Sequence, residues 1–418
     1  MVEKRKVSVA SKRQRQITRR RFIVGTGAAA LSLTIVKPKL VRATDANSKI
    51  RLGMIGCGGR GKWIAKLFVE HGGFEIAAAA DYFQDRVDTF GEKFNVDPAH
   101  RYTGLLCYRR LLEQKLDAVA IESPPYFHPE QAAAAVDAGC HVYVAKPIAV
   151  DVPGCHTIAE SGKRASANKL CFIVDFQTRA NEFYIEALKR VHEGALGRLA
   201  FGEASYHTGG TWGGHEKYLK DDPGNPENRL RAWGLDRTLS GDIITEQNIH
   251  AIDVASWIMN KPPLYAVGTG GRKVRTIRTC WDHFAVLFQY SNNVGINFSS
   301  RQFNAHGSKP DGIRNRMFGS KGVLETEYGG TVIIRGDNFY RGGKTNEIFK
   351  QGAVNNIATF HQNITGGCFN NPTVVPSVRS NLVTILGRTA AYTGKKVYWD
   401  KLFKSTEKLE ADLQGLKT

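Results

Sequence analysis

A glycine-rich turn between an apolar strand and a helix constrains the fold of this chain more than any other segment. The turn reads Gly56, Cys57, Gly58, Gly59, Arg60 and Gly61, which matches the spacing G-x-G-x-x-G. Residues 50–56 before it predict a strand, and residues 62–70 after it predict a helix. In such a unit the first glycine permits the tight turn, the second lets a pyrophosphate approach the backbone, and the third allows close helix packing. The segment therefore predicts a dinucleotide site at a helix N-terminus.

Apolar runs and helical patterns alternate through the next hundred residues. Further strands are predicted at 75–80, 118–123, 141–145 and 170–176, with helices between them at 84–94, 108–114, 130–138 and 152–167. This alternation is typical of a parallel, doubly wound sheet of the α/β class. We therefore predict a Rossmann domain over residues 49–176.

The pattern changes to that of an α+β domain from residue 177. Helices are predicted at 181–193 and 378–392, and strands at 284–290, 294–300, 322–326 and 331–335. Turn residues between these strands favour hairpins. A chain of 418 residues is long enough for two domains. The second is predicted over 177–400, with a large, mostly antiparallel open-faced sheet, and residues 401–418 are predicted to form a C-terminal tail.

An acidic residue stands where the second strand should end. Asp81 follows Gly61 by 20 residues, and a carboxylate there can accept hydrogen bonds from the adenine ribose hydroxyls. It would repel a 2′-phosphate, so Asp81 favours NAD over NADP. Arg86 lies close enough in the sequence to keep NADP as the less favoured alternative.

The net charge of +19 is concentrated at the N-terminus. Residues 1–43 hold twelve Lys and Arg residues and one Glu, so the remainder is only mildly basic. The chain shows neither a basic helix interleaved with aromatics nor zinc-finger spacing, and nucleic acid is not expected as a partner.

The basic segment resembles a twin-arginine export signal. Residues 18–23 read Thr-Arg-Arg-Arg-Phe-Ile and lead into an apolar stretch over 22–36. At about 1.5 Å per residue this stretch is too short to span a hydrocarbon core of about 30 Å. Residues 41–43 offer a cleavage site, so residues 1–43 are predicted to be a signal peptide. The mature protein is then expected in the periplasm, with membrane contact only during export.

Cysteine and histidine spacing predicts neither disulfides nor a metal. The seven cysteines are odd in number, scattered and without a C-x-x-C pair. No His, Cys and Asp cluster has metal-ligand spacing.

Three further segments make the chain resemble one known family. Residues 121–128 resemble a "TPxxxH" loop, residues 141–147 an "EKP" segment, and residues 240–253 a "GGxLxDxGxHxxD" segment. These are motifs of the glucose-fructose oxidoreductase, inositol dehydrogenase and rhizopine catabolism (Gfo/Idh/MocA) family. Ala145 replaces the family's usual Glu, and Glu246 replaces its usual Asp. Neither change removes the lysine or the histidine of the motifs.

The resemblance implies roles for individual residues. His250 is implied as the base that takes the proton of a substrate hydroxyl, which suits an imidazole with a pKa near 6.5. Lys146 is implied to bind that hydroxyl and the cofactor, and Glu246 to orient substrate hydroxyls. Glu246 and His250 stand four residues apart, which places them on one face if the stretch is helical. The remaining cofactor contacts are expected from Ser123, Pro124 and His128, and the remaining substrate contacts from Gln177, Arg179, Tyr206, Trp212 and Trp233.

The sequence therefore predicts an NAD(P)-dependent oxidoreductase that oxidises a ring hydroxyl of a sugar, glycoside or polyol with a tightly held cofactor. One alternative is an NAD-dependent glycoside hydrolase that works through a transient 3-keto intermediate. It ranks second because residues 246–250 lack the tyrosine- and histidine-bearing motif associated with those glycosidases. Another alternative is a non-catalytic sugar-binding relative, suggested by Ala145. A homo-oligomer, dimer or tetramer, is expected from the open sheet.

Overall fold

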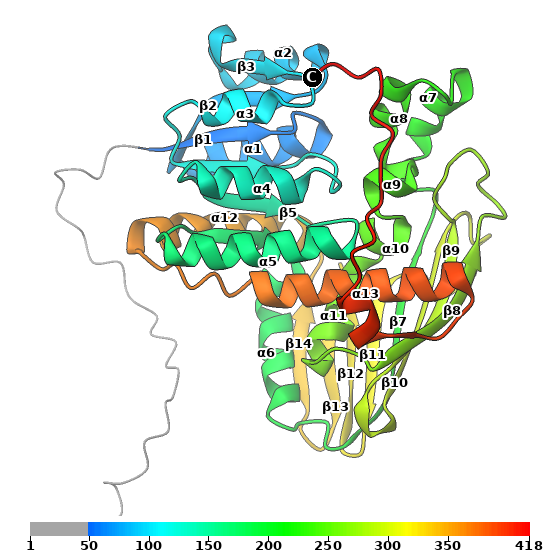
Figure 1. The fold of residues 1–418 in the computed structure, drawn as a ribbon. Helices are drawn as coiled ribbons and strands as arrows, with labels where there is room; N and C mark the ends of the chain where they lie inside the picture. Colours follow the sequence, from blue (N-terminus) through cyan, green and yellow to red (C-terminus); the bar gives the residue numbers. More distant parts are fainter. Residues whose placement is uncertain (1–48) are drawn as a thin grey trace, which may run out of the picture. The chain divides into compact units, whose positions relative to one another are not determined.

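The computed structural model describes residues 49–418 of the chain. The predicted signal peptide, residues 1–43, lies outside the described residues. The described part contains a parallel sheet followed by a larger, mostly antiparallel one (Figure 1), which confirms the predicted fold class. None of its helices is long and apolar enough to cross a membrane.

The first sheet is the predicted Rossmann sheet. Its six strands are all parallel in the order β3-β2-β1-β4-β5-β6. They are β1 (Ile50–Ile55), β2 (Phe74–Asp81), β3 (Arg101–Thr103), β4 (Ala118–Ile121), β5 (His141–Ala145) and β6 (Phe172–Asp175). The inner strands are runs of buried apolar residues because helices cover both faces of the sheet. The carboxyl ends of β1, β2, β4 and β5 carry the predicted cofactor motifs to one edge.

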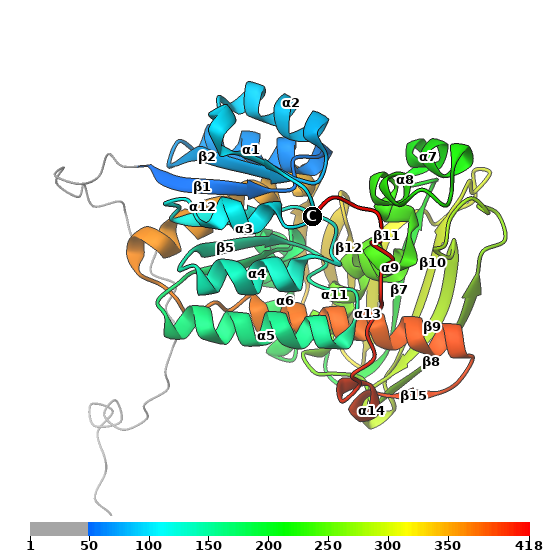
Figure 2. The same cartoon turned by 45° about the horizontal axis from the view of Figure 1, so that its top comes forward.

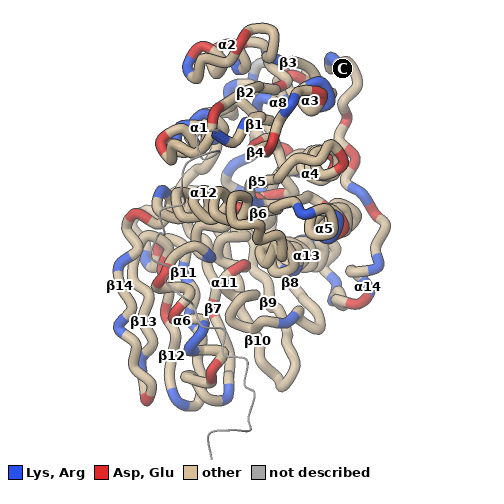
Figure 3. The backbone as a smooth tube through the Cα atoms, turned by 90° about the vertical axis from the view of Figure 1, so that its left-hand side faces the viewer, with Lys and Arg blue, Asp and Glu red and all other residues tan. Residues whose placement is uncertain are grey.

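Helices pack on both faces of this sheet, as Figure 3 shows from the side. One face carries α1 (Gly59–His71), α2 (Gln84–Phe94) and α12 (Ile348–Gly366), and the other carries α3 (Cys107–Leu112), α4 (His128–Asp137) and α5 (Val152–Ala167). The helix α12 comes from the range predicted for the second domain, yet its Ala353, Ile357 and Phe360 are buried in the core of the first sheet. Gly352 and three asparagines weaken its helical pattern, so the sequence did not reveal it.

The second sheet has nine strands in the order β14-β13-β12-β11-β7-β10-β9-β8-β15. Only β7 and β10 pair in parallel. The strands are β7 (Leu199–Thr208), β8 (Tyr265–Gly271), β9 (His283–Gln289), β10 (Gly295–Gln302), β11 (Gly312–Gly319), β12 (Gly322–Glu327), β13 (Thr331–Gly336), β14 (Tyr340–Lys344) and β15 (Val397–Tyr398). Helices α6 (Glu182–His192), α11 (Ile249–Met259) and α13 (Val374–Thr393) pack against one face, and Figure 2 shows no helix over the other.

Short helices between β7 and α11 form a cap beside the Rossmann domain. We use the name cap for residues 209–240, which contain α7 (Glu216–Asp221), α8 (Pro226–Arg231) and α9 (Arg237–Ser240); α10 (Ile243–Glu246) follows. Three contacts join the cap to the Rossmann domain: Arg231 pairs with Asp85 at 2.9 Å, Tyr82 donates to Glu227 at 2.9 Å, and Tyr126 N–H donates to the Leu239 carbonyl at 3.2 Å. The cap is thereby held over the edge that carries the glycine-rich turn.

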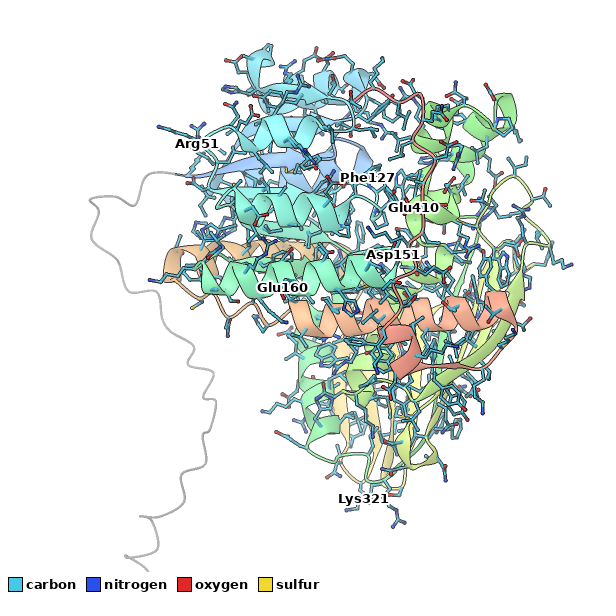
Figure 4. All side chains as sticks on the ribbon, in the orientation of Figure 1. Arg51, Phe127, Asp151, Glu160, Lys321 and Glu410 are labelled. Carbon is cyan, nitrogen blue, oxygen red and sulfur yellow. The ribbon has the colours of Figure 1, made fainter. Side chains whose placement is uncertain are left out.

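The predicted C-terminal tail is docked along the chain's own surface. After α14 (Trp399–Phe403) it runs past the start of α5 and the cap to the Rossmann domain (Figures 1 and 2). The N–H of Leu409 donates to Asp151 at 3.0 Å, near the labelled Asp151 and Glu410 in Figure 4. The Lys417 carbonyl accepts from Leu105 N–H at 2.8 Å, and buried Leu416 packs in a cluster with Phe83 of the Rossmann domain and Leu230 of the cap. The tail therefore joins the cap to the Rossmann domain.

Candidate active site

The glycine-rich turn has the geometry that its sequence predicts. Gly56 has φ of +98°, and a Cβ there would lie 2.5 Å from the backbone of Glu122. A Cβ on Gly61 would lie 1.9 Å from the Gly56 carbonyl oxygen, whereas Gly59 has open space around it. The N–H of Lys62 is bonded to the Gly58 carbonyl, so the N–H groups of residues 59–61 precede the first helical hydrogen bond. They are available to an anion at the positive end of α1.

Asp81 lies at the predicted place, at the end of β2, and braces the turn. Its carboxylate accepts hydrogen bonds from Cys57 N–H at 2.8 Å and from Phe83 N–H at 3.1 Å. Burial raises the pKa of Asp81, and the charge of nearby Arg86 opposes this rise. Asp81 and Arg86 line one groove with the glycine-rich turn, Ser123 and Pro124. This groove, which we call the dinucleotide groove, is closed on its far side by Trp212, His215, Leu230 and Trp233 of the cap.

His128 connects two loops at the edge of the groove. Its ring nitrogens lie 2.7 Å from the Ser123 carbonyl and 2.8 Å from the Pro147 carbonyl. Ser123 donates from its hydroxyl to Gln131 at 2.6 Å. The ring of His128 is buried and lies between the segments that carry Ser123 and Lys146, so it positions them.

A second pocket adjoins the groove and gathers the predicted catalytic residues. This catalytic pocket is lined by Lys146, Glu246 and His250, together with Gln177, Tyr206, Trp212 and Trp233. Lys146 Nζ donates to the Glu246 carbonyl oxygen at 2.7 Å and lies 3.3 Å from its Oε1. Glu246 is the residue that departs from the family pattern, and it supplies a carboxylate to Lys146 where Ala145 has none. Of the two departures, Glu246 contacts the ammonium group of Lys146, and Ala145 lines the same pocket.

Glu246 and His250 reach the pocket from two short helices rather than from one. Helix α10 ends at Glu246, and α11 begins at Ile249 after a break at Gln247 and Asn248. The expected common helical face is therefore wrong in detail, although both side chains line the same pocket. Gln247, at the break, belongs to a chain of hydrogen bonds: Tyr206 donates to Gln247, and Gln247 donates to Glu246.

His250 is partly buried in this pocket. Its Nδ1 is buried and has no hydrogen-bond partner among the described residues. Burial, reinforced by the positive charges of Lys146 and Arg60, lowers the pKa of His250 well below its usual value. The lowered pKa favours the neutral imidazole, in which one ring nitrogen carries a proton and the other has a free lone pair.

Aromatic rings form the cap side of the catalytic pocket. Trp212 donates from Nε1 to Glu246 Oε2 at 3.3 Å, and its ring centroid lies 4.9 Å from that of Trp233. Tyr206, expected to contact substrate, lies in β7 and lines this pocket. Flat aromatic faces beside hydrogen-bonding groups suit a ring that carries C–H faces and hydroxyls.

Arg179, predicted to bind substrate, does not line the pocket. Its guanidinium forms a two-pronged ion pair with buried Asp253 at 2.8–3.0 Å and stacks on Trp257 at 4.9 Å. The side chain is thus engaged between the segment after β6 and α11. Proximity to Gln177 in the sequence suggested the pocket, but the turn Thr178–Ala180 directs the two side chains to different surroundings.

Two family models match successive parts of the chain. Residues 50–174 match the model of the oxidoreductase family with an NAD-binding Rossmann fold, and residues 184–325 match that of the GFO/IDH/MocA C-terminal domain. The chain belongs to the Gfo/Idh/MocA family. Its residues 50–174 match the NAD-binding domain of that oxidoreductase family.

The sequence identity to individual relatives is low. A glycosyl hydrolase family 109 protein from Shewanella sp. (strain W3-18-1) is 29% identical over 215 residues, which cover 46% of each chain. The match thus spans about half the length of that relative. Myo-inositol 2-dehydrogenase from Lactobacillus plantarum is 21% identical with a TM-score of 0.66, over 84% of this chain and 99% of that one. Aldose-aldose oxidoreductase from Caulobacter crescentus is 19% identical with a TM-score of 0.65, over 84% and 100%.

The residues present fit the dinucleotide of this family. The turn at 56–61 leaves no room for a side chain at Gly56 or Gly61. The N–H groups at the start of α1 have no partner among the described residues and can bind an anion. The Arg60 side chain, predicted to bind the cofactor, is held by Glu122 and by Asp175. Its part in anion binding is then that of its backbone N–H. Among residues 49–418 no group of three His, Cys, Asp or Glu side chains is arranged to hold a metal ion.

The sequence did not single out three residues of the pocket walls. Glu122 and Tyr328 line the catalytic pocket with Phe349. The Tyr328 ring lies 5.4 Å from the His250 ring, and its buried hydroxyl has no partner among the described residues. Tyr328 follows a strand by one residue and carries no motif, so only the fold places it near His250.

Proposed function

We propose that this oxidoreductase oxidises a ring hydroxyl of a sugar, glycoside or polyol. The observation that carries the proposal is the meeting of Lys146, Glu246 and His250 in one pocket that adjoins the dinucleotide groove. When bound, NAD accepts the hydride from the hydroxyl-bearing carbon. The base, the cation and the hydride acceptor are then brought to one substrate carbon.

His250 takes the hydroxyl proton as the C–O bond becomes a carbonyl. Its lowered pKa favours the neutral imidazole before the step. Lys146 stabilises the negative charge that develops on the oxygen, and its contact with Glu246 fixes its ammonium group. Gln177, Gln247 and Tyr206 offer hydrogen bonds to neighbouring hydroxyls, and Trp212 and Trp233 offer apolar faces. The predicted preference for NAD over NADP rests on Asp81.

A second candidate is redox-neutral glycoside cleavage. The curated relatives at 29–32% identity are named as glycosyl hydrolase family 109 proteins, and this favours it over the non-catalytic alternative. In that reaction oxidation at C3 acidifies the neighbouring C–H, the aglycone leaves, water adds, and the hydride returns. The same Lys146 and His250 serve the first step. The two functions differ in their products: the oxidoreductase releases a keto product, whereas the glycosidase releases the aglycone.

A panel of free sugars and aryl glycosides separates the two functions. Absorbance of reduced nicotinamide and released aglycone are followed together. A keto product with reduced cofactor supports the oxidoreductase. Released aglycone without accumulated reduction supports the glycosidase. No turnover and no nucleotide binding would contradict both and leave the non-catalytic relative.

Export of a loaded enzyme belongs to the same proposal. The twin-arginine motif at residues 18–23 is the basis for placing the mature protein in the periplasm, where its cofactor would have to stay bound and be regenerated in place. Release of nicotinamide on denaturation of protein purified from the periplasm supports this. Accumulation of a fusion in the cytoplasm, unchanged by Arg19→Lys and Arg20→Lys, would contradict export.

The open face of the second sheet is the proposed oligomer surface. Ion pairs cross its strands, including Arg316 with Glu203 and Arg335 with Glu325, and a groove runs between them. Light scattering of the wild type and of Ile333→Glu tests a dimer or tetramer through this face. A monomeric wild type would contradict it.

A further inference from the structure

A buried acid lies where the dinucleotide groove and the catalytic pocket meet. Six residues line both cavities: Gly59, Arg60, Glu122, Ser123, Trp212 and Trp233. Among them Glu122 is the only carboxylate. Hydride transfer requires the nicotinamide to meet the substrate carbon, so the redox end of the cofactor belongs at this junction.

Glu122 belongs to a charge cluster that is not neutral. Arg60 Nε lies 3.0 Å from Glu122 Oε2, and another nitrogen of the same guanidinium contacts Asp175. Both carboxylates are fully buried, so two negative charges share one positive charge. Lys146 is a further cation nearby, but its ammonium group is paired with Glu246.

The two carboxylates of the cluster differ in their surroundings. Asp175 also accepts hydrogen bonds from Asn356 at 2.7 Å and from Gln177 at 3.3 Å. The oxygens of Glu122 accept no well-directed hydrogen bond from the described residues. Burial raises the pKa of Glu122 to about 7, with Arg60 opposing the rise and Asp175 adding to it. Glu122 is therefore the member of the cluster whose negative charge is compensated least, since it shares Arg60 with Asp175.

We infer that Glu122 makes the bound dinucleotide favour its oxidised form. The oxidised nicotinamide ring carries a positive charge that the reduced ring lacks. A ring placed at the junction lies beside Glu122, whose negative charge is only partly compensated. In a site shielded from water such a charge is screened only weakly. The inference rests on the proposed function, because it requires a nicotinamide cofactor in this groove.

The consequence for the reaction is a cofactor that returns its hydride readily. Oxidation of the substrate moves two electrons and a proton to the ring as hydride, and the hydroxyl proton goes to His250. The ring then loses the charge that Glu122 stabilises, so the reduced state is disfavoured. A cofactor that stays bound through oxidation and re-reduction of substrate needs this balance, whether a second substrate or the same sugar takes the hydride back.

The test compares affinities for NAD⁺ and NADH in the wild type, in Glu122→Gln and in Glu130→Gln. Glu130 is a matched control because it lies on the surface of α4 in an exposed pair with Arg109. Stripped protein is titrated with each nucleotide by calorimetry at a pH above 7, where the Glu122 carboxyl is ionised. We expect the NAD⁺/NADH affinity ratio to fall about tenfold in Glu122→Gln and to stay constant in the control. A tenfold change corresponds to about 30 mV for a two-electron couple.

Two further variants keep the inference open to refutation. Glu122→Asp retains the charge and should retain the ratio. Asp175→Asn removes the other negative charge of the cluster and should lower the ratio if Glu122→Gln fails to fold. A ratio unchanged within about twofold in every folded charge-removing variant overturns the inference. A wild type that binds neither nucleotide refutes the proposed function instead.

Discussion

The dinucleotide groove and the catalytic pocket share a wall, yet they are built in different ways. The groove follows from local backbone geometry: Gly56 and Gly61 admit no side chain, and Asp81 braces the turn through two backbone N–H groups. The pocket follows from side chains that come from distant segments, with Lys146 bonded to Glu246 across 100 residues of sequence. We therefore expect the dinucleotide groove to tolerate changes in its other side chains. We expect the catalytic pocket to depend on each of its polar contacts.

The largest expected effect is on turnover, from His250→Ala. General acid–base catalysis contributes about 100- to 10,000-fold, so kcat should fall by at least that lower factor. Bound nicotinamide should be retained, because His250 does not line the groove. Steady-state kinetics and cofactor content are measured beside His192→Ala, an exposed histidine on α6. More than about a tenth of wild-type activity in His250→Ala would remove it from the base role and make Glu246 the next candidate.

The next effect is on stability, from Arg179→Met. Removing one partner of a buried ion pair leaves Asp253 uncompensated, so the free energy of unfolding should fall by about 3 to 5 kcal/mol. Arg335→Met breaks an exposed pair with Glu325 and should cost less than about 1 kcal/mol. Urea unfolding measures both. Equal costs would mean that the Arg179 pair is not the buried contact that the fold places there.

Glycine positions test whether the groove depends on backbone space. Gly61→Ala puts a Cβ 1.9 Å from the Gly56 carbonyl oxygen, so the turn must shift. We expect about 1 to 3 kcal/mol of lost stability and weaker nucleotide binding. Gly59→Ala meets no atom within 4 Å and should keep the stability of the wild type. Thermal unfolding of both variants decides this, and a stable Gly61→Ala protein would contradict it.

The docked tail should contribute a similar amount. Leu416→Ala removes a buried side chain from the cluster that joins the cap to the Rossmann domain, at a cost of about 2 kcal/mol. Leu264→Ala is the control, because Leu264 is 52% exposed. Urea unfolding and the dissociation rate of the nucleotide are measured for each. Matching values for both leucines would show that the tail does not hold the cap.

The smallest effect is on pH dependence. The pKa of His250 is lowered, so its neutral form persists below pH 6.5, and activity should decline only as the pH falls through this depressed value. The stability that comes from burying the neutral ring has the same sign, being present above about pH 6.5 and lost on acidification. A pH profile of kcat/KM with an acid limb above pH 6.5 would show that another group is the base.

Local patterns in the sequence were sufficient for the dinucleotide groove and for five of the six Rossmann strands, but not for β3 or for α12, which packs on that sheet. The strand at residues 50–56, the glycines that follow and Asp81 act through their own backbone neighbourhood, so their spacing encodes their geometry. The lysine and histidine of the catalytic pocket came from motifs of the family. Strand alternation predicted the class of the second sheet and four of its strands, whereas β7, β8, β11, β14 and β15 were missed. Glycine and asparagine blur the period in β11 and in the helix α12, which was also missed.

Tertiary structure alone decided which of these residues meet. Arg179 stands two residues from Gln177, yet it pairs with Asp253 outside the pocket. Glu122, Tyr328 and the tail carry no local signal, because their surroundings come from distant segments. Lys417 of the tail, for example, bonds to Tyr82, 335 residues away. Sequence fixes conformation over a few residues through backbone sterics and hydrogen bonds. Burial and charge compensation depend on long-range packing. That packing placed Glu122, which shares Arg60 with Asp175, beside the dinucleotide groove.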